Sequence, residues 1–194
     1  MLSYRHVFHA GNHADVLKHL VQVLILQYLV KKEGKALRYI DTHAGAGGYD
    51  LRSANAGKNR EFDSGIARLW QRADLPPPLE SYLPILRSMN PAGQLVHYPG
   101  SPTIAAQILH ASHRLDLFEL HPDDAKRLAR WAQQDRRIKV EQGDGFAALK
   151  AILPPIEKRA LVMIDPPYEM KTDYTTVVSA LQQAIRKFAT GVYA

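Results

Sequence analysis

Residues 160–168, with the sequence ALVMIDPPY, combine an apolar run with a rigid polar end. The first five residues are typical of a strand that is buried on both faces of a parallel sheet. The two prolines fix φ and keep the backbone that follows out of a helix. The Asp165 carboxylate and the Pro166 carbonyl can then both accept hydrogen bonds from one exocyclic amine, and Tyr168 can stack on the ring that carries it. The stretch predicts a pocket for a planar amino group at the end of a strand.

The tetrapeptide 165–168 resembles motif IV, (D/N)PP(Y/F/W), of the S-adenosylmethionine-dependent amino-methyltransferases. An ordinary turn after a strand is the alternative interpretation, since proline and tyrosine are common there. The surrounding sequence has to distinguish the two.

Apolar runs alternate with amphipathic segments along most of the chain. The predicted strands cover residues 37–41, 115–120, 138–141 and 160–164. The predicted helices cover residues 14–32, 102–111, 123–134, 146–152 and 175–188, with Asn12 or Asp15, Ser101, Asp123 and Asp144 as candidate N-caps. This alternation predicts an α/β protein with a predominantly parallel sheet and helices on both faces.

Residues 49–98 interrupt the alternation. They contain two short helical patterns, 65–72 and 79–89, separated by a run of three prolines. We therefore expect residues 49–98 to form a small helical insertion subdomain. Residues 1–48 are expected to supply an N-terminal tail, a helix and the first strand with its glycine loop, and residues 99–194 the remainder of the same α/β domain.

Polar residues follow each predicted strand of the sheet. They are Asp41, His43, Glu119, His121, Asp144, Gly145 and Asp165. Ligands of open α/β sheets bind beyond the carboxyl ends of the strands, near the topological switch point. The sequence therefore predicts that these residues form one binding site.

The loop after the first strand carries Gly45 and Gly47. The dinucleotide fingerprint G-x-G-x-x-G requires glycine at position 50, which is Asp50, and no phosphate-binding G-x-x-x-x-G-K-[ST] is present. An NAD enzyme and a P-loop NTPase are thus disfavoured. The loop instead resembles motif I of Rossmann-like methyltransferases, (D/E)-x-x-x-G-x-G.

Composition favours an ordinary globular protein with a polyanionic partner. The net charge is +6, and residues 1–72 carry 11 Lys and Arg against 6 Asp and Glu. There is no cysteine, and the longest apolar segment, 20–30, is too short to span a bilayer. We expect a soluble cytoplasmic protein. His9 and His13 lack the acidic neighbour of a metalloprotease motif, so no metal site is predicted.

Four stretches together resemble the bacterial 23S rRNA adenine-N6 methyltransferase family: residues 2–6, 8–19, 41–47 and 165–174. The resemblance implies a Rossmann-like methyltransferase fold, S-adenosylmethionine as methyl donor, 23S rRNA as partner, and neither a metal nor a membrane nor an obligate protein partner. It implies donor contacts at His19, His43, Gly45, Gly47, Ser101, Glu119, Asp144 and Gly145. Asp165 matches the catalytic residue, Lys18 lies in a motif beside the donor, and Tyr4 and His6 belong to an N-terminal tail tied to catalysis.

Proteins of this family continue beyond position 194, so the resemblance implies further strands after the one that begins near residue 190. Other interpretations stay open on the residues alone. A DNA adenine-N6 methyltransferase shares the D-P-P-Y tetrapeptide, whereas glutamine methyltransferases usually begin it with Asn, so Asp165 argues against that class. A non-enzymatic RNA-binding module would explain the charge but not the polar strand ends. An RNA-binding fragment that is inactive through C-terminal truncation is a further alternative.

Overall fold

The computed structural model describes residues 6–194. Contacts within the chain divide these residues into two compact units. The first unit consists of Leu29–Ala46 and Leu109–Ala194, and the second of residues 6–28 and Gly47–Ile108. The domain boundaries that the sequence predicts, after residues 48 and 98, stay a prediction.

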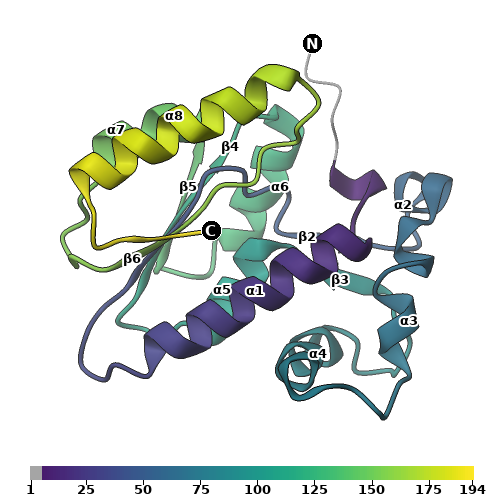
Figure 1. Ribbon diagram of the computed structural model, residues 1–194. Helices are drawn as coiled ribbons and strands as arrows, with labels where there is room; N and C mark the ends of the chain where they lie inside the picture. Colours follow the sequence, from purple (N-terminus) through teal and green to yellow (C-terminus); the bar gives the residue numbers. More distant parts are fainter. Residues whose placement is uncertain (1–5) are drawn as a thin grey trace. The chain divides into compact units, whose positions relative to one another are not determined.

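The first unit is built on a five-stranded parallel sheet (Figure 1). Its strands are β1 (Arg38–Asp41), β4 (Arg114–Glu119), β5 (Ile138–Gln142), β6 (Ala160–Met163) and β7 (Val192–Tyr193), in the order β5-β4-β1-β6-β7. The central strands are almost entirely buried, as expected of largely apolar strands in a parallel sheet. The predicted strands are thus confirmed, and the predicted start of a strand near residue 190 corresponds to β7.

The helices of the first unit are α6 (Pro122–Ala132), α7 (Gly145–Ile152) and α8 (Lys171–Lys187). Asp144 caps α7 as expected, because its side chain accepts hydrogen bonds from the backbone N–H groups of Phe146 and Ala147. The predicted cap of α6 was wrong. His121, not Asp123, occupies that position and accepts a hydrogen bond from the Asp123 backbone N–H.

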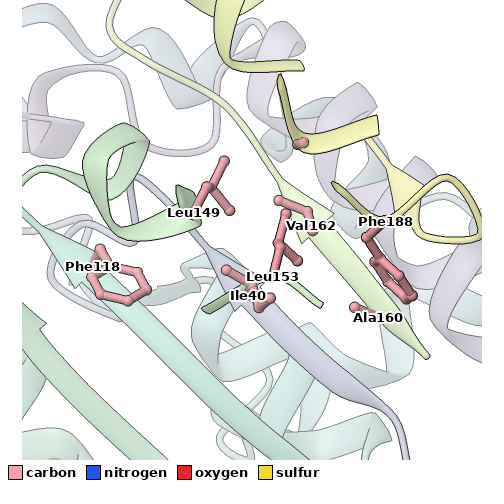
Figure 2. Close-up of a cluster of buried hydrophobic side chains, with 8 residues drawn as sticks. Ile40, Phe118, Leu149, Leu153, Ala160, Val162 and Phe188 are labelled. Atoms are coloured by element: carbon pink, nitrogen blue, oxygen red, sulfur yellow. The ribbon is translucent and has the colours of Figure 1, made fainter. Parts of the chain in front are cut away.

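Helices α7 and α8 pack on one face of the sheet (Figures 1 and 2). Their shared core consists of Ile40, Phe118, Leu149, Leu153, Ala160, Val162, Ala184 and Phe188. Burying each of the larger side chains contributes about 1.5–3 kcal/mol. Crossover connections between parallel strands are right-handed. The connection through α6 runs outward from β4 to β5, whereas the connections through α7 and α8 run in the opposite direction across the sheet. Helix α6 therefore covers the other face.

The second unit is mainly helical. Its α-helices are α1 (His13–Val30, whose last two residues belong to the first unit), α2 (Ala54–Asn59), α3 (Ala67–Trp70), α4 (Pro77–Met89) and α5 (Ser101–Ile108), accompanied by the short 3-10 helices η1 (His6–Phe8) and η2 (Glu61–Asp63). Asn12 caps α1, since its Oδ1 accepts from the Asp15 backbone N–H at 2.9 Å. Two strands that the sequence did not predict, β2 (Gly48–Asp50) and β3 (His97–Pro99), pair antiparallel. Over the described residues, no helix is both long enough and apolar enough to cross a membrane.

Candidate active site

The polar strand ends of the first unit meet at the topological switch point of the sheet. Strand β1 is paired with β4 on one side and β6 on the other, and the chain leaves β1 and β6 in opposite directions. His43 follows β1 and Asp165 follows β6. The predicted site residues of this unit therefore lie where ligands of such sheets bind.

Glu119, the last residue of β4, holds the glycine loop. Its Oε2 accepts from the Gly45 backbone N–H at 2.8 Å, and its Oε1 accepts from the His121 backbone N–H at 2.7 Å. Burial raises the pKa of Glu119, although both backbone N–H groups oppose that shift. The carboxylate is fixed at the strand end, and its remaining lone pairs can accept hydrogen bonds from hydroxyl groups.

Gly145 fits closely against the backbone after β1. A Cβ atom at this position would lie 2.2 Å from the Thr42 carbonyl oxygen and 2.6 Å from the Thr42 Cα. Only glycine allows this approach. The adjacent Asp144 is exposed and caps α7 through Oδ1, which leaves Oδ2 directed to other donors.

His43 is held in one tautomer. The Thr42 hydroxyl donates to the Met163 carbonyl at 3.0 Å and lies 2.8 Å from His43 Nδ1, so Nδ1–H donates to Thr42 Oγ1 and Nε2 keeps its lone pair. The ring packs edge-on against Phe146, with centroids 4.9 Å apart. Burial lowers the pKa of His43 to about 4, against the opposing charges of Asp165, Asp144 and Asp173. His43 is therefore neutral at pH 7.

This lowered pKa predicts an acid-sensitive contribution to stability. His43 stays neutral in the folded state down to about pH 4, whereas the unfolded chain takes up its proton below about pH 6.5. The contribution is therefore present above pH 6.5 and is lost as the pH falls toward 4. Between pH 7 and pH 5, the free energy of unfolding of the wild type should fall by about 1–2 kcal/mol more than that of His43→Gln, as measured by urea unfolding. His13→Gln, at the exposed first residue of α1, is the control and should match the wild type.

The segment after β6 is strained and exposed. Tyr168 has φ of 54°, a left-handed conformation that is uncommon for an aromatic residue and typical of functional sites. Its ring lies beside that of Tyr174, with centroids 4.8 Å apart, and 38% of the residue is accessible. Burial and the Asp165 charge raise the pKa of Tyr168. Asp165 is partly exposed, so both side chains can be reached from solvent.

The predicted residues of the second unit gather around Asp15, which is 3% exposed. Its carboxylate lies 2.8 Å from His6 Nε2 and 2.7 Å from Lys18 Nζ, and it accepts from the Gly11 backbone N–H at 3.0 Å. Burial alone would raise the pKa of Asp15, but the neighbouring His6 and Lys18 side chains hold it well below its usual range. Asp15 thus fixes His6 and Lys18. Sequence analysis missed this role, for which the only signal was an acid at the start of an apolar helix.

His19 is almost completely buried beside Asp15. Its Nδ1 lies 3.0 Å from the Tyr98 hydroxyl, which is in turn 2.8 Å from the Tyr82 hydroxyl. Its Nε2 is 3.9 Å from Asp15 Oδ1 and has no hydrogen-bond partner among the described residues. Burial lowers the pKa of His19 to about 3, so the ring is neutral.

Ser101 and Gly47 also belong to the second unit. Ser101 is the buried first residue of α5, and its carbonyl accepts from Gln22 Nε2 at 2.8 Å. The Gly47 carbonyl accepts from the Gly100 backbone N–H at 2.8 Å and from the Thr103 hydroxyl at 2.7 Å. Gly47 and α5 are thereby fixed to each other.

The candidate residues accordingly form two groups. The first unit holds His43, Gly45, Glu119, Asp144, Gly145, Asp165, Pro166 and Tyr168; the second holds His6, Lys18, His19, Gly47 and Ser101. Tyr4 lies outside the described residues. Across residues 6–194, no three His, Cys, Asp or Glu side chains are placed to hold a metal ion. His9 instead bonds to Glu61 at 2.9 Å.

Comparison with known proteins places the chain among rRNA-modifying enzymes. The family model described as "RsmJ: Ribosomal RNA large subunit methyltransferase D, RlmJ" matches residues 34–194. Proteins named "Ribosomal RNA large subunit methyltransferase J" from Escherichia coli (strain K12) and Haemophilus influenzae (strain ATCC 51907 / DSM 11121 / KW20 / Rd) are 55% identical over 194 residues and 49% identical over 195 residues. Both alignments cover 100% of this chain and 69% of the relative.

A solved structure has the same fold. The crystal structure of protein LPL1258 from Legionella pneumophila matches with a TM-score of 0.89 and 40% sequence identity. The match covers 95% of this chain and 68% of that one. The Rossmann-like methyltransferase fold predicted from the sequence is confirmed.

Proposed function

Because this chain belongs to the bacterial RlmJ family of ribosomal RNA large subunit methyltransferases, we propose that it transfers a methyl group from S-adenosylmethionine to the N6 amine of an adenine in 23S rRNA. One observation carries the choice of an amino group. Asp165 and its Pro-Pro-Tyr segment come just after β6 at the switch point, beside β1, which Thr42 and His43 follow.

The first unit fits the methyl donor. Glu119 offers a fixed carboxylate for ribose hydroxyls, and Asp144 Oδ2 offers an acceptor for the exocyclic amine of the donor's adenine. Gly145, which follows Asp144, has no side chain and so allows the start of α7 to lie against the Thr42 backbone. When bound, S-adenosylmethionine supplies a methyl group that its sulfonium has already activated. These residues bind and orient it.

The acceptor side depends on residues 165–168. The N6 lone pair of adenine is delocalised into the ring, so hydrogen bonds from the amine to Asp165 and to the Pro166 carbonyl favour a tetrahedral nitrogen. Holding that nitrogen in line with the methyl group lowers the barrier further. As the N–C bond forms, the bond from the methyl carbon to the donor sulfur would break, and the sulfur would keep the electron pair and leave as a neutral thioether. The amine loses a proton, and the Asp165 carboxylate is placed to accept it as a general base.

An adenine must leave its stack to reach Asp165, which favours single-stranded or looped RNA. Tyr168 offers a partly exposed ring on which the extruded base can stack.

Lys18 is proposed to support catalysis from the second unit. Its ammonium is held 2.7 Å from Asp15, in the cluster that also contains His6 and His19. We expect Lys18→Ala to lower kcat at least tenfold. Because the variant also leaves the buried Asp15 carboxylate with one charged partner fewer, the free energy of unfolding should fall by about 1–3 kcal/mol. Steady-state methylation kinetics and urea unfolding test this. Lys31→Ala, at an exposed lysine just beyond the end of α1, is the control and should retain full activity; unchanged kcat in Lys18→Ala would reduce Lys18 to a structural ion pair.

The test of the activity uses radiolabelled S-adenosylmethionine with three acceptors in parallel. These are protein-free unmodified 23S rRNA, assembled large ribosomal subunits and duplex DNA. After digestion, label in N6-methyladenosine from rRNA is the expected result. Label in DNA would overturn the RNA assignment, and label in a nucleoside other than N6-methyladenosine would overturn the assignment of the acceptor atom.

A further inference from the structure

A groove lies between α7 and α8 in the first unit. It encloses about 330 Å³. Phe146, Leu149 and Ala184 supply apolar surface, whereas Lys150, Arg186 and Lys187 supply three cationic side chains. Leu149 and Ala184 also belong to the buried core, so the floor of the groove is anchored in the sheet (Figure 2).

The positive charge of the groove is uncompensated. No acidic side chain is among the residues that line it. Within residues 6–194, none of Lys150, Arg186 and Lys187 takes part in an ion pair, whereas Arg38 and Arg137 of the same unit do. The Lys187 ammonium donates to the Lys150 carbonyl, which ties the end of α8 to α7. Three unpaired cations over an apolar floor match a ligand that has both anionic groups and flat apolar faces.

The groove begins at the candidate active site. Phe146 lines the groove and also packs against His43 at 4.9 Å between ring centroids. The Phe146 backbone N–H is bonded to Asp144, one of the proposed donor residues. Lys150 follows one helical turn later, about 6 Å along α7. A strand whose adenine enters the site can therefore continue directly into the groove.

We propose, building on the proposed function, that the groove between α7 and α8 binds the sugar–phosphate backbone of the acceptor RNA next to the target adenine. Phosphates meet Lys150, Arg186 and Lys187 at the rim, and a sugar or base face covers Phe146. Lysine and arginine are the usual phosphate contacts of proteins that bind nucleic acids, and they position the strand without reading its sequence. Aromatic rings beside such cations are typical of grooves for single strands.

Salt dependence distinguishes a phosphate site from a structural role. The test variant is Lys150→Gln with Arg186→Gln; Lys187 is kept because it bonds to Lys150. The control is Lys126→Gln with Arg130→Gln, two exposed cations of α6 on the opposite face of the sheet. Binding of a protein-free 23S rRNA fragment is measured by filter retention across a salt series, without donor. We expect the test variant to bind about tenfold more weakly at 0.15 M salt, with a slope of log K against log salt smaller by about 1.4.

The control variant should keep the wild-type slope and bind within about twofold of the wild type. An unchanged slope in the test variant, or an equal loss in the control, would overturn the assignment of the groove. The assignment would also be overturned if the test variant lost affinity for anionic phosphatidylglycerol vesicles but not for RNA. Urea unfolding of both variants excludes a folding defect as the cause.

The same variants separate the groove from the activity. In methylation assays, we expect the test variant to show a KM for RNA raised about tenfold, with kcat and donor affinity unchanged. Failure of the wild type to methylate rRNA, together with the expected loss of RNA affinity, would reject the proposed reaction and leave the groove as an RNA site. Normal methylation with a wild-type KM in the test variant would support the proposed reaction and reject the groove as an RNA site.

Discussion

Replacing Asp165 by alanine is expected to abolish methyl transfer while donor binding stays intact. The variant removes both the hydrogen-bond acceptor for the amine and the base for its proton. Loss of a positioned general base alone costs about 10²–10⁴-fold in rate, so kcat should fall at least 10³-fold. Asp165 is partly exposed and belongs to no buried core cluster, so the fold should tolerate the change.

Single-turnover methylation of 23S rRNA measures the rate, and titration calorimetry with S-adenosylmethionine measures donor affinity. Glu169→Ala is the matched control, because Glu169 is an exposed carboxylate four residues further along the same segment. It should retain near-wild-type kcat. A loss of donor affinity in Asp165→Ala as large as the loss of rate would contradict the role given to Asp165.

Asp165→Asn divides the two roles of the carboxylate. The amide keeps one oxygen that can accept from the amine but cannot take up its proton. If proton acceptance dominates, Asn should be as inactive as Ala. If hydrogen bonding dominates, Asn should recover at least tenfold over Ala. Either outcome assigns the main contribution of this residue.

The strand ends were predictable because two local signals coincide there. A buried parallel strand is largely apolar, so 160–164 and 115–118, the latter apolar apart from Asp116, stand out, and the first polar residue after each run marks the edge of the sheet. Glu119 and Asp165 were found in this way. The contacts that fix them, such as Gly45 N–H to Glu119, join residues 74 positions apart and leave no local pattern.

The features that sequence analysis missed depend on tertiary contacts. Strands β2 and β3 have three residues each and pair across more than forty intervening positions, so neither shows a period of its own. Helix α8 begins at Lys171, four residues before the predicted start, since the Asp173 side chain accepts from the Met170 backbone N–H. The predicted helix places Lys18 three residues after Asp15, within reach of it, but only the fold brings His6 of η1 to the same carboxylate.

Gly145→Ala is expected to show the largest loss of stability of any small substitution at the site. Helix propensity alone favours alanine over glycine by about 1 kcal/mol in a helix. Here the added Cβ would lie 2.2 Å from the Thr42 carbonyl oxygen, and that atom belongs to the backbone between β1 and the glycine loop. Neither segment can shift without disturbing the Thr42–Met163 hydrogen bonds, so the clash should exceed the propensity and destabilise the fold by about 2–4 kcal/mol.

Gly143→Ala is the control two residues away, because a Cβ at that position would meet no atom within 4 Å. It should change the free energy of unfolding by less than about 0.5 kcal/mol. Urea unfolding of both variants measures the difference, and calorimetry with S-adenosylmethionine tests whether any folded Gly145→Ala protein binds the donor. We expect weaker binding, since the displaced start of α7 carries Asp144 away from its position. Wild-type stability in Gly145→Ala would mean that the Thr42 backbone can shift at little cost. In that case, the close approach of α7 to β1 does not determine the shape of the donor side of the site.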